Sequence, residues 1–290
     1  MKLLARFTCA FILCSSQVHA VEAFRGPLSS SLGGTGIAGL EGIEGVLLNP
    51  AQLAILKGYA LDTYYRDGYV ADGQHRQGWG IGAGDNGGDV MFPGALHYAR
   101  MRDTGRGPVP ANGDLVHFAI ADRVGMVPGL FLGLSGYQLR YAMRGYAKTT
   151  QWNYSAGLLW LATPEFGLAY VLNNIAHPGS NVPIGLREEL QQGAGVYGVV
   201  AGIAGIRADV TRNEVNNPGK KLVYMAGFES LSGKFAIVRA GYRRDEQADQ
   251  RFMTLGVGFN GPRIKFDYGY EKNLEGARGA LHSVDLRLPF

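Results

Sequence analysis

The chain has 290 residues, a formal net charge of +4 and 44 glycines. Both cysteines, Cys9 and Cys14, lie within the first twenty residues, so the rest of the chain can form no disulfide and offers no thiol chemistry. No cluster of lysine and arginine follows those twenty residues, and nucleic-acid binding is therefore not expected.

Residues 1–20 have the pattern of a secretory signal peptide. Lys2 and Arg6 precede a short apolar run over 7–14, and Val18-His19-Ala20 places small residues where cleavage occurs. A lipoprotein signal at Cys14 is the alternative, although it would have Leu13 where a small residue is expected. No second apolar run approaches 18 residues, which argues against a helical membrane protein.

Residues 21–57 are predicted to form a flexible apolar lead and a short helix. Gly34 to Gly39 match G-x-G-x-x-G, but they follow no strand, and Gly42 and Gly45 weaken any helix after them. A nucleotide site is therefore not expected. Asn49 can cap a helix that has Pro50 in its first position, followed by Ala51.

The rest of the chain is predicted to be all-β, because short segments with alternating apolar and polar residues lie between turn signals. In 150–161, for example, Trp152 and Tyr154 alternate with Asn153 and Ser155. Fourteen strands are expected, over 58–70, 76–85, 90–103, 112–123, 128–141, 150–161, 165–174, 188–200, 203–212, 219–229, 233–244, 249–260, 262–272 and 279–290.

Alternation fits both a soluble sandwich and an outer-membrane barrel, and three features favour the barrel. Aromatic residues gather at strand ends, as Trp152 and Trp160 do. The odd-numbered connections are mostly long and polar, whereas the even-numbered ones are tight. The chain also stops at Phe290, at the end of an alternating strand. That ending resembles the C-terminal signal read by the barrel-assembly machinery of bacterial outer membranes.

The opening stretch Leu-Gly-Gly-Thr-Gly-Ile-Ala-Gly over 32–39, followed by Asn49-Pro50-Ala51, resembles the N-terminus of FadL-type and PorV-like outer-membrane barrels. Asn173 and Asn174, Pro183, Leu186 and the glycine-rich run 193–196 match the PorV-like pattern. The resemblance implies an antiparallel transmembrane β-barrel of about 14 strands over 58–290, with residues 21–57 folded into the lumen as a hatch.

The resemblance also implies a function in the outer membrane of a Gram-negative bacterium, in contact with outer-membrane lipid. FadL-like proteins pass hydrophobic compounds such as long-chain fatty acids, which leave sideways where the third strand is kinked. A PorV-like role in secretion, or a structural role, is the alternative. The oligomeric state stays open.

The third expected strand contains Pro93 and Gly94, which could produce such a kink. The alternative is a proline at the start of the strand.

Charged residues on the polar faces of the strands are expected to line the lumen as paired ions, or else to provide selectivity. They are Asp62, Arg66, Arg207, Asp209, Arg239, Arg263, Lys265, Asp267, Glu271, Asp285 and Arg287.

Catalysis and metal binding are not expected, and no cofactor is implied. His97 and His117 fall on neighbouring expected strands, but neither has an evident acid or nucleophile partner, and their spacing matches no known ligand pattern.

Overall fold

The computed structural model describes residues 24–39, 42–70, 75–87, 91–104, 112–142, 147–176, 182, 188–213, 222–230, 235–275 and 279–290. The expected signal peptide, Pro183 and Leu186 lie outside these residues. Much of the sequence expected to form the odd-numbered connections also lies outside the described residues.

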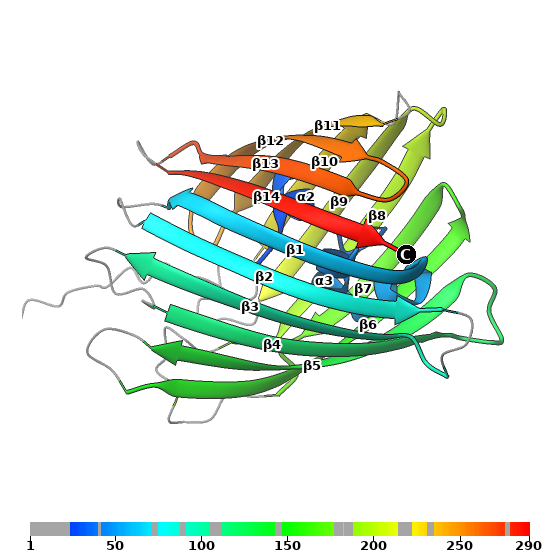
Figure 1. Ribbon diagram of the computed structural model, residues 1–290, viewed down its shortest axis with the longest axis horizontal. Coiled ribbons are helices and arrows are strands. Elements are labelled where there is room, and N and C mark those ends of the chain that lie inside the picture. Colours follow the sequence, from blue (N-terminus) through cyan, green and yellow to red (C-terminus); the bar gives the residue numbers. More distant parts are fainter. Residues whose placement is uncertain are drawn as a thin grey trace, which may run out of the picture.

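The described part of the chain forms one closed barrel of fourteen antiparallel strands in sequential order, in which β1 also pairs with β14 (Figure 1). The expected strand ranges agree with the observed ones to within four residues at either end. The strands are β1 (Gly58–Tyr69), β2 (His75–Asn86), β3 (Gly94–Thr104), β4 (Asn112–Arg123), β5 (Leu130–Ala142), β6 (Thr149–Thr163), β7 (Phe166–Asn173), β8 (Gln191–Val200), β9 (Ala204–Asn213), β10 (Leu222–Ser230), β11 (Ala236–Asp245), β12 (Gln250–Asn260), β13 (Lys265–Asn273) and β14 (Ala280–Pro289).

The outer face of the barrel is apolar and the inner face is largely polar. On β6, Trp152 and Tyr154 are 56% and 52% exposed, whereas Asn153 between them is 1% exposed. An apolar surface that surrounds the whole molecule would be wetted in water, so it belongs against lipid tails. The protein is therefore a transmembrane barrel.

The N-terminal segment, residues 24–39 and 42–56, lies inside the barrel. It contains two short α-helices, α2 (Pro27–Ser31) and α3 (Ile43–Leu48), and the 3-10 helix η1 (Pro50–Ile55). Helix α2 packs on β11 to β14, and η1 packs on β2, β4, β5 and β6, on the opposite wall. Among the described residues, no helix is long and apolar enough to cross a membrane.

Pro93 lies at the start of the third strand, which is the alternative given above, and the strand is not kinked there. Pro93 precedes β3, which begins at Gly94, and β3 pairs without interruption with β2 and with β4. A proline just outside a strand removes no ladder hydrogen bond, so the wall stays intact there. The pairing of β6 with β7 does contain a register shift, between Leu161 and Thr163.

Candidate transport lumen

Two wall carboxylates hold the backbone of the N-terminal segment. Asp62 on β1 accepts a hydrogen bond from the N–H of Ile43 at 2.6 Å. Asp209 on β9 accepts from the N–H groups of Gly36 and Ile37 at 2.7 and 2.9 Å. Both carboxylates are buried. Because bonds from N–H to a carboxylate are stronger than neutral ones, these contacts fix the segment to the wall at two separate strands.

A third buried carboxylate lies within the segment itself. Glu44 of α3 accepts hydrogen bonds from Leu28 N–H at 3.1 Å and Ser29 N–H at 2.8 Å, which ties α3 to α2. Burial outweighs these bonds and the nearby Arg287 and Arg66, and it raises the pKa of Glu44 to about 7. The docked position therefore favours the protonated carboxyl, and the connection between the two helices is expected to weaken as the pH rises toward 7.

Asn49 fastens the next turn of the segment. Its side chain accepts the N–H of Ala51 at 3.0 Å, which caps η1, and Pro50 takes the first helical position. Its Nδ2 donates to the carbonyls of Ile37 at 3.0 Å and Leu158 at 3.2 Å. Gly157 of β6 makes this approach possible, because a Cβ there would collide with the Asn49 oxygen.

Paired ions cover one sector of the inner wall. Glu229 lies between Arg207, at 2.6 Å, and Arg239, at 3.3 Å. Asp267 pairs with both Arg239 and Arg287. Because Gly258 of the intervening β12 has no side chain, Arg239 of β11 can reach Asp267 of β13. The chain of ions links β9, β10, β11, β13 and β14.

The structure places most of the expected lumen charges on this inner face. Lys265 and Glu271 are of intermediate exposure. Arg263 is exposed in the turn between β12 and β13, so its expected place in the lumen is wrong. Strand β13 begins at Lys265, and the alternation does not extend back to Arg263. The buried members are Asp62, Arg66, Arg207, Asp209, Arg239, Asp267, Asp285 and Arg287.

The opposite sector of the lumen is mostly uncharged. Phe24 and Leu47 of the N-terminal segment pack there against inward side chains of the wall. The wall members of this buried cluster include Tyr64, Ala99, Met101, Leu115, Tyr137, Leu139 and Tyr141. We call this the neutral sector. It presents an apolar surface inside the barrel, whereas the lumen of a water-filled pore is lined by polar groups.

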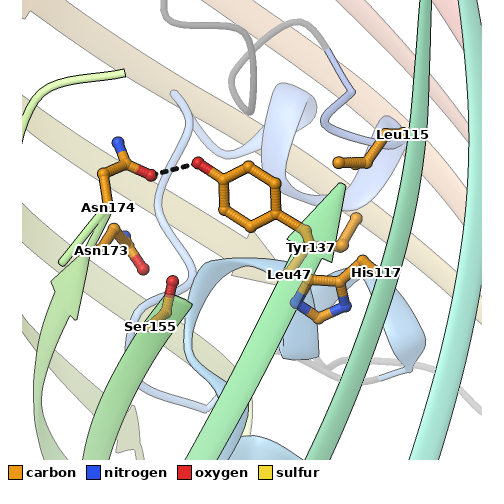
Figure 2. A pocket seen from close by; sticks show the side chains of 7 residues that line it. All are labelled: Leu47, Leu115, His117, Tyr137, Ser155, Asn173 and Asn174. Carbon is orange, nitrogen blue, oxygen red and sulfur yellow. Dashed lines mark hydrogen bonds between the residues drawn. The ribbon is translucent and has the colours of Figure 1, made fainter. Parts of the chain in front are cut away.

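A small cavity remains between the N-terminal segment and the neutral sector (Figure 2). Its lining residues are Leu47, Leu115, His117, Tyr137, Ser155, Asn173 and Asn174. Its volume of 10 Å³ is about the least that admits one water molecule, whereas a cavity of about 150 Å³ accommodates benzene. No hydrophobic compound of that size fits this cavity, and Leu47 of α3 forms one side of it.

Residues that follow β7 also fold against the neutral sector. The Tyr137 hydroxyl donates to Asn174 Oδ1, as Figure 2 shows. The Tyr141 hydroxyl donates to Glu188 at 3.1 Å, and Asn153 exchanges two hydrogen bonds with the backbone of Ala176. Asn174 and Glu188 are buried. Asn174, Ala176 and Glu188 therefore fill part of the lumen together with the N-terminal segment.

His97 and His117 face each other across β3 and β4, and both are buried. The ring of His97 stacks on Tyr64 at 5.8 Å between centroids. Among the described residues, no group of three His, Cys, Asp or Glu could hold a metal ion.

The chain end lies on the outside of the barrel. Phe290 is 75% exposed, its N–H donates to the carbonyl of Tyr59 at 2.9 Å, and the two rings are 5.8 Å apart. Its use as an insertion signal stays a prediction.

Several residues that shape the lumen were not expected. Glu229 lies near the end of an expected strand, and alternation from Val223 would have placed it inward, beside Arg207. The buried Arg76–Asp103 pair, at 2.8 Å, sits likewise at strand ends. No local pattern points to Tyr141 or Glu188, because their hydrogen bond joins residues 47 positions apart.

No protein-family model and no curated protein matches the chain. Solved structures do. The toluene transporter TbuX of Ralstonia pickettii matches with a TM-score of 0.64 and 14% identity, over 94% of this chain and 100% of that one. The toluene transporter TodX of Pseudomonas putida matches with a TM-score of 0.64 and 12% identity, over 91% of this chain and 98% of that one. A FadL homologue of Pseudomonas aeruginosa matches with a TM-score of 0.65 and 12% identity, over 91% of this chain and 98% of that one.

These matches show that the chain has the fold of FadL-type outer-membrane barrels. The matched proteins are described as transporters or as a FadL homologue, and none is described as an enzyme. This agrees with a lumen whose buried charges are largely engaged in ion pairs or in holding the N-terminal segment.

Proposed function

We propose that the protein transports small hydrophobic compounds across the outer membrane of a Gram-negative bacterium. The observation that carries the proposal is the neutral sector, an apolar surface inside the barrel that leads to the cavity beside Leu47. A hydrophobic molecule loses its contact with water on such a surface, with a gain of roughly 25 cal/mol per Å² buried. The fold shared with two toluene transporters supports the same class of substrate.

Transport requires the N-terminal segment to move. The cavity is smaller than an aromatic ring, and one side of it is formed by Leu47 of α3. The hydrogen bonds of Asp62, Asp209 and Asn49 hold this closed arrangement. The segment therefore acts as a hatch, and release of a few contacts would widen the path along the neutral sector.

The experiment compares uptake in cells that lack the gene with uptake in the same cells complemented with the gene. Radiolabelled toluene and a radiolabelled long-chain fatty acid are supplied separately, because they distinguish a short from a long hydrophobic substrate. Leu115→Gln introduces a polar group into the neutral sector and is expected to reduce uptake about tenfold. Leu281→Gln makes the same change at a buried position on β14, in the charged sector, and serves as the control.

Equal uptake with and without the gene, for both compounds, would refute transport of these hydrophobes. If the deletion strain instead retained exported proteins in its periplasm, a PorV-like role in secretion would replace the proposal. Reduced uptake in Leu115→Gln together with normal uptake in Leu281→Gln would support it. Heat-modifiable migration of both variants on a gel shows that each barrel has folded.

A further inference from the structure

Exposed basic side chains form a belt on the outer face of the barrel, close to one rim. We call this the basic belt, and its members are Arg102, Arg140, Arg212, Arg244, Arg251 and Lys272. All of them lie near the strand ends that lead to the odd-numbered connections. They therefore surround a single rim, although they come from six different strands.

The strand register shows how closely neighbouring members lie. Arg140 of β5 faces Asp114 of β4, which faces Arg100 of β3, two residues before Arg102. Arg244 of β11 lies directly opposite Arg251 of β12. Like charges directly opposite each other are unfavourable in a sheet, so this placement calls for an anion nearby.

The anions within the protein do not satisfy the belt. Glu275 lies 2.6 Å from Arg251, whereas Asp114 lies 3.6 Å from Arg100, which is not a member of the belt. Within the described ranges, Arg102, Arg140, Arg212 and Arg244 form no ion pair. The belt therefore carries an excess of positive charge on an outward surface.

A row of aromatic side chains lies one step nearer the middle of the barrel. Tyr242 precedes Arg244 by two residues and Tyr270 precedes Lys272 by two, and Trp152 follows Thr150, which faces Arg140, by two. Two residues of a strand span roughly 6.6 Å. Aromatic rows mark the interface between lipid tails and headgroups, so the basic belt lies at the level of the headgroups.

The opposite rim has no comparable excess among the described residues. Its exposed charged side chains are three basic and two acidic, Lys57, Arg123, Arg263, Asp122 and Glu165. In the described part of the belt rim, the six members and Lys148 are exposed beside only two acidic side chains, Asp249 and Glu275. The two leaflets of the membrane would therefore meet different charges on this protein.

From this placement we infer that the basic belt binds the phosphate groups of phosphorylated lipid headgroups in the leaflet at that rim. Arginine forms paired hydrogen bonds with phosphate oxygens, and the charges are exposed at the depth where headgroups lie. In a bacterial outer membrane such lipids, of the lipid A type, occupy the outer leaflet. The belt would thus direct the odd-numbered connections outward and surround the barrel with tightly held lipid.

The test uses the full chain in nanodiscs, with lipid A as the probe. One triple variant carries Arg140→Gln, Arg244→Gln and Arg251→Gln. The control carries Lys57→Gln, Arg123→Gln and Arg263→Gln, which also removes three positive charges, but at the opposite rim. Native mass spectrometry and a binding titration measure lipid A bound per barrel.

Each basic side chain near an anionic membrane surface contributes about fivefold to affinity, so the belt variant should bind about a hundredfold more weakly. The control variant should bind like the unaltered protein. Equal losses in the two variants, or no loss in the belt variant, would overturn the inference.

A second measurement does not depend on any variant. The unaltered protein is titrated with diphosphorylated lipid A and with the same lipid after enzymatic removal of both phosphates. A large difference that decreases at high salt supports phosphate recognition. Equal binding would mean that only the acyl chains are recognised. Competition by inorganic phosphate at low concentration would refute a lipid site by showing that free phosphate suffices.

Discussion

Replacing Asn49 with alanine should release the N-terminal segment from the wall without opening the barrel. The side chain is 0% exposed and makes three hydrogen bonds, to Ala51, Ile37 and Leu158. Loss of the cap costs about 1 kcal/mol, and each of the two abandoned carbonyls costs about as much. The expected weakening is roughly 3 kcal/mol, or about a hundredfold in the population of released segment.

Hydrogen exchange followed by mass spectrometry measures this release, because peptides over 24–56 can be compared with peptides of the strands. In Asn49→Ala the protection of the segment should fall about a hundredfold, while protection of β1 and β14 should not change. Asn49→Asp keeps the cap but loses the two donated bonds, so it should show an intermediate effect.

Thr63→Ala is the control, since this side chain lies on the exposed face of β1. Unchanged protection of the segment in Asn49→Ala would show that the hydrogen bonds of Asn49 do not hold it. Equal loss of protection in the segment and in the strands would show instead that the segment and the barrel unfold together. Either result refutes the reasoning.

Three further predictions concern the lumen. Gly157→Ala should displace the segment and raise single-channel conductance, because the added Cβ would collide with Asn49. Gly198→Ala is the control, since a Cβ there would have no atom within 4 Å, and it should leave conductance unchanged. Equal conductance in the two variants would contradict the close approach of Asn49 to Gly157. Glu44 has a pKa raised from 4.5 to about 7, so the docked segment should be most stable below pH 4.5, weaken by roughly 3 kcal/mol as the pH rises to 7 and change no further above it. Conductance should rise over that range, and Glu44→Gln should remove this part of the pH dependence; an unaltered profile would exclude Glu44 as its source. Glu229→Gln should destabilise the barrel by about 3 kcal/mol, since it leaves two buried arginines without their shared partner. Glu275→Gln, in the partly exposed pair with Arg251, should cost less than about 1 kcal/mol, and similar losses in heat-modifiable gel migration for the two variants would show that burial of the pair is unimportant.

The strands could be predicted because alternation is a local property. Trp152, Asn153 and Tyr154 reveal the two faces of β6 without any knowledge of its neighbours. Strand ends are less certain. Arg263 and Pro93 each lie just outside the expected strand, so Arg263 does not line the lumen and Pro93 does not interrupt β3.

The contacts of the lumen could not be predicted in the same way, because they depend on register and on residues far apart in sequence. Asp267 meets Arg239 only because Gly258 leaves a gap in the strand between them. Asn49 was recognised as a cap from its neighbour Pro50, but its bond to Leu158 crosses 109 positions. Such pairs can be identified only from the three-dimensional structure of the closed barrel.

The attachments of the N-terminal segment also determine the order of assembly. Asp62 belongs to β1, Leu158 to β6 and Asp209 to β9, and Thr254 of β12 holds Ser31 and Gly33 at 3.0 and 2.9 Å. These partners come together only when most of the chain has been built into the wall, although the segment precedes every strand in the sequence. The full set of attachments therefore cannot form before β12 has joined the wall, and the segment that comes first in the sequence is held by contacts that depend on strands made much later.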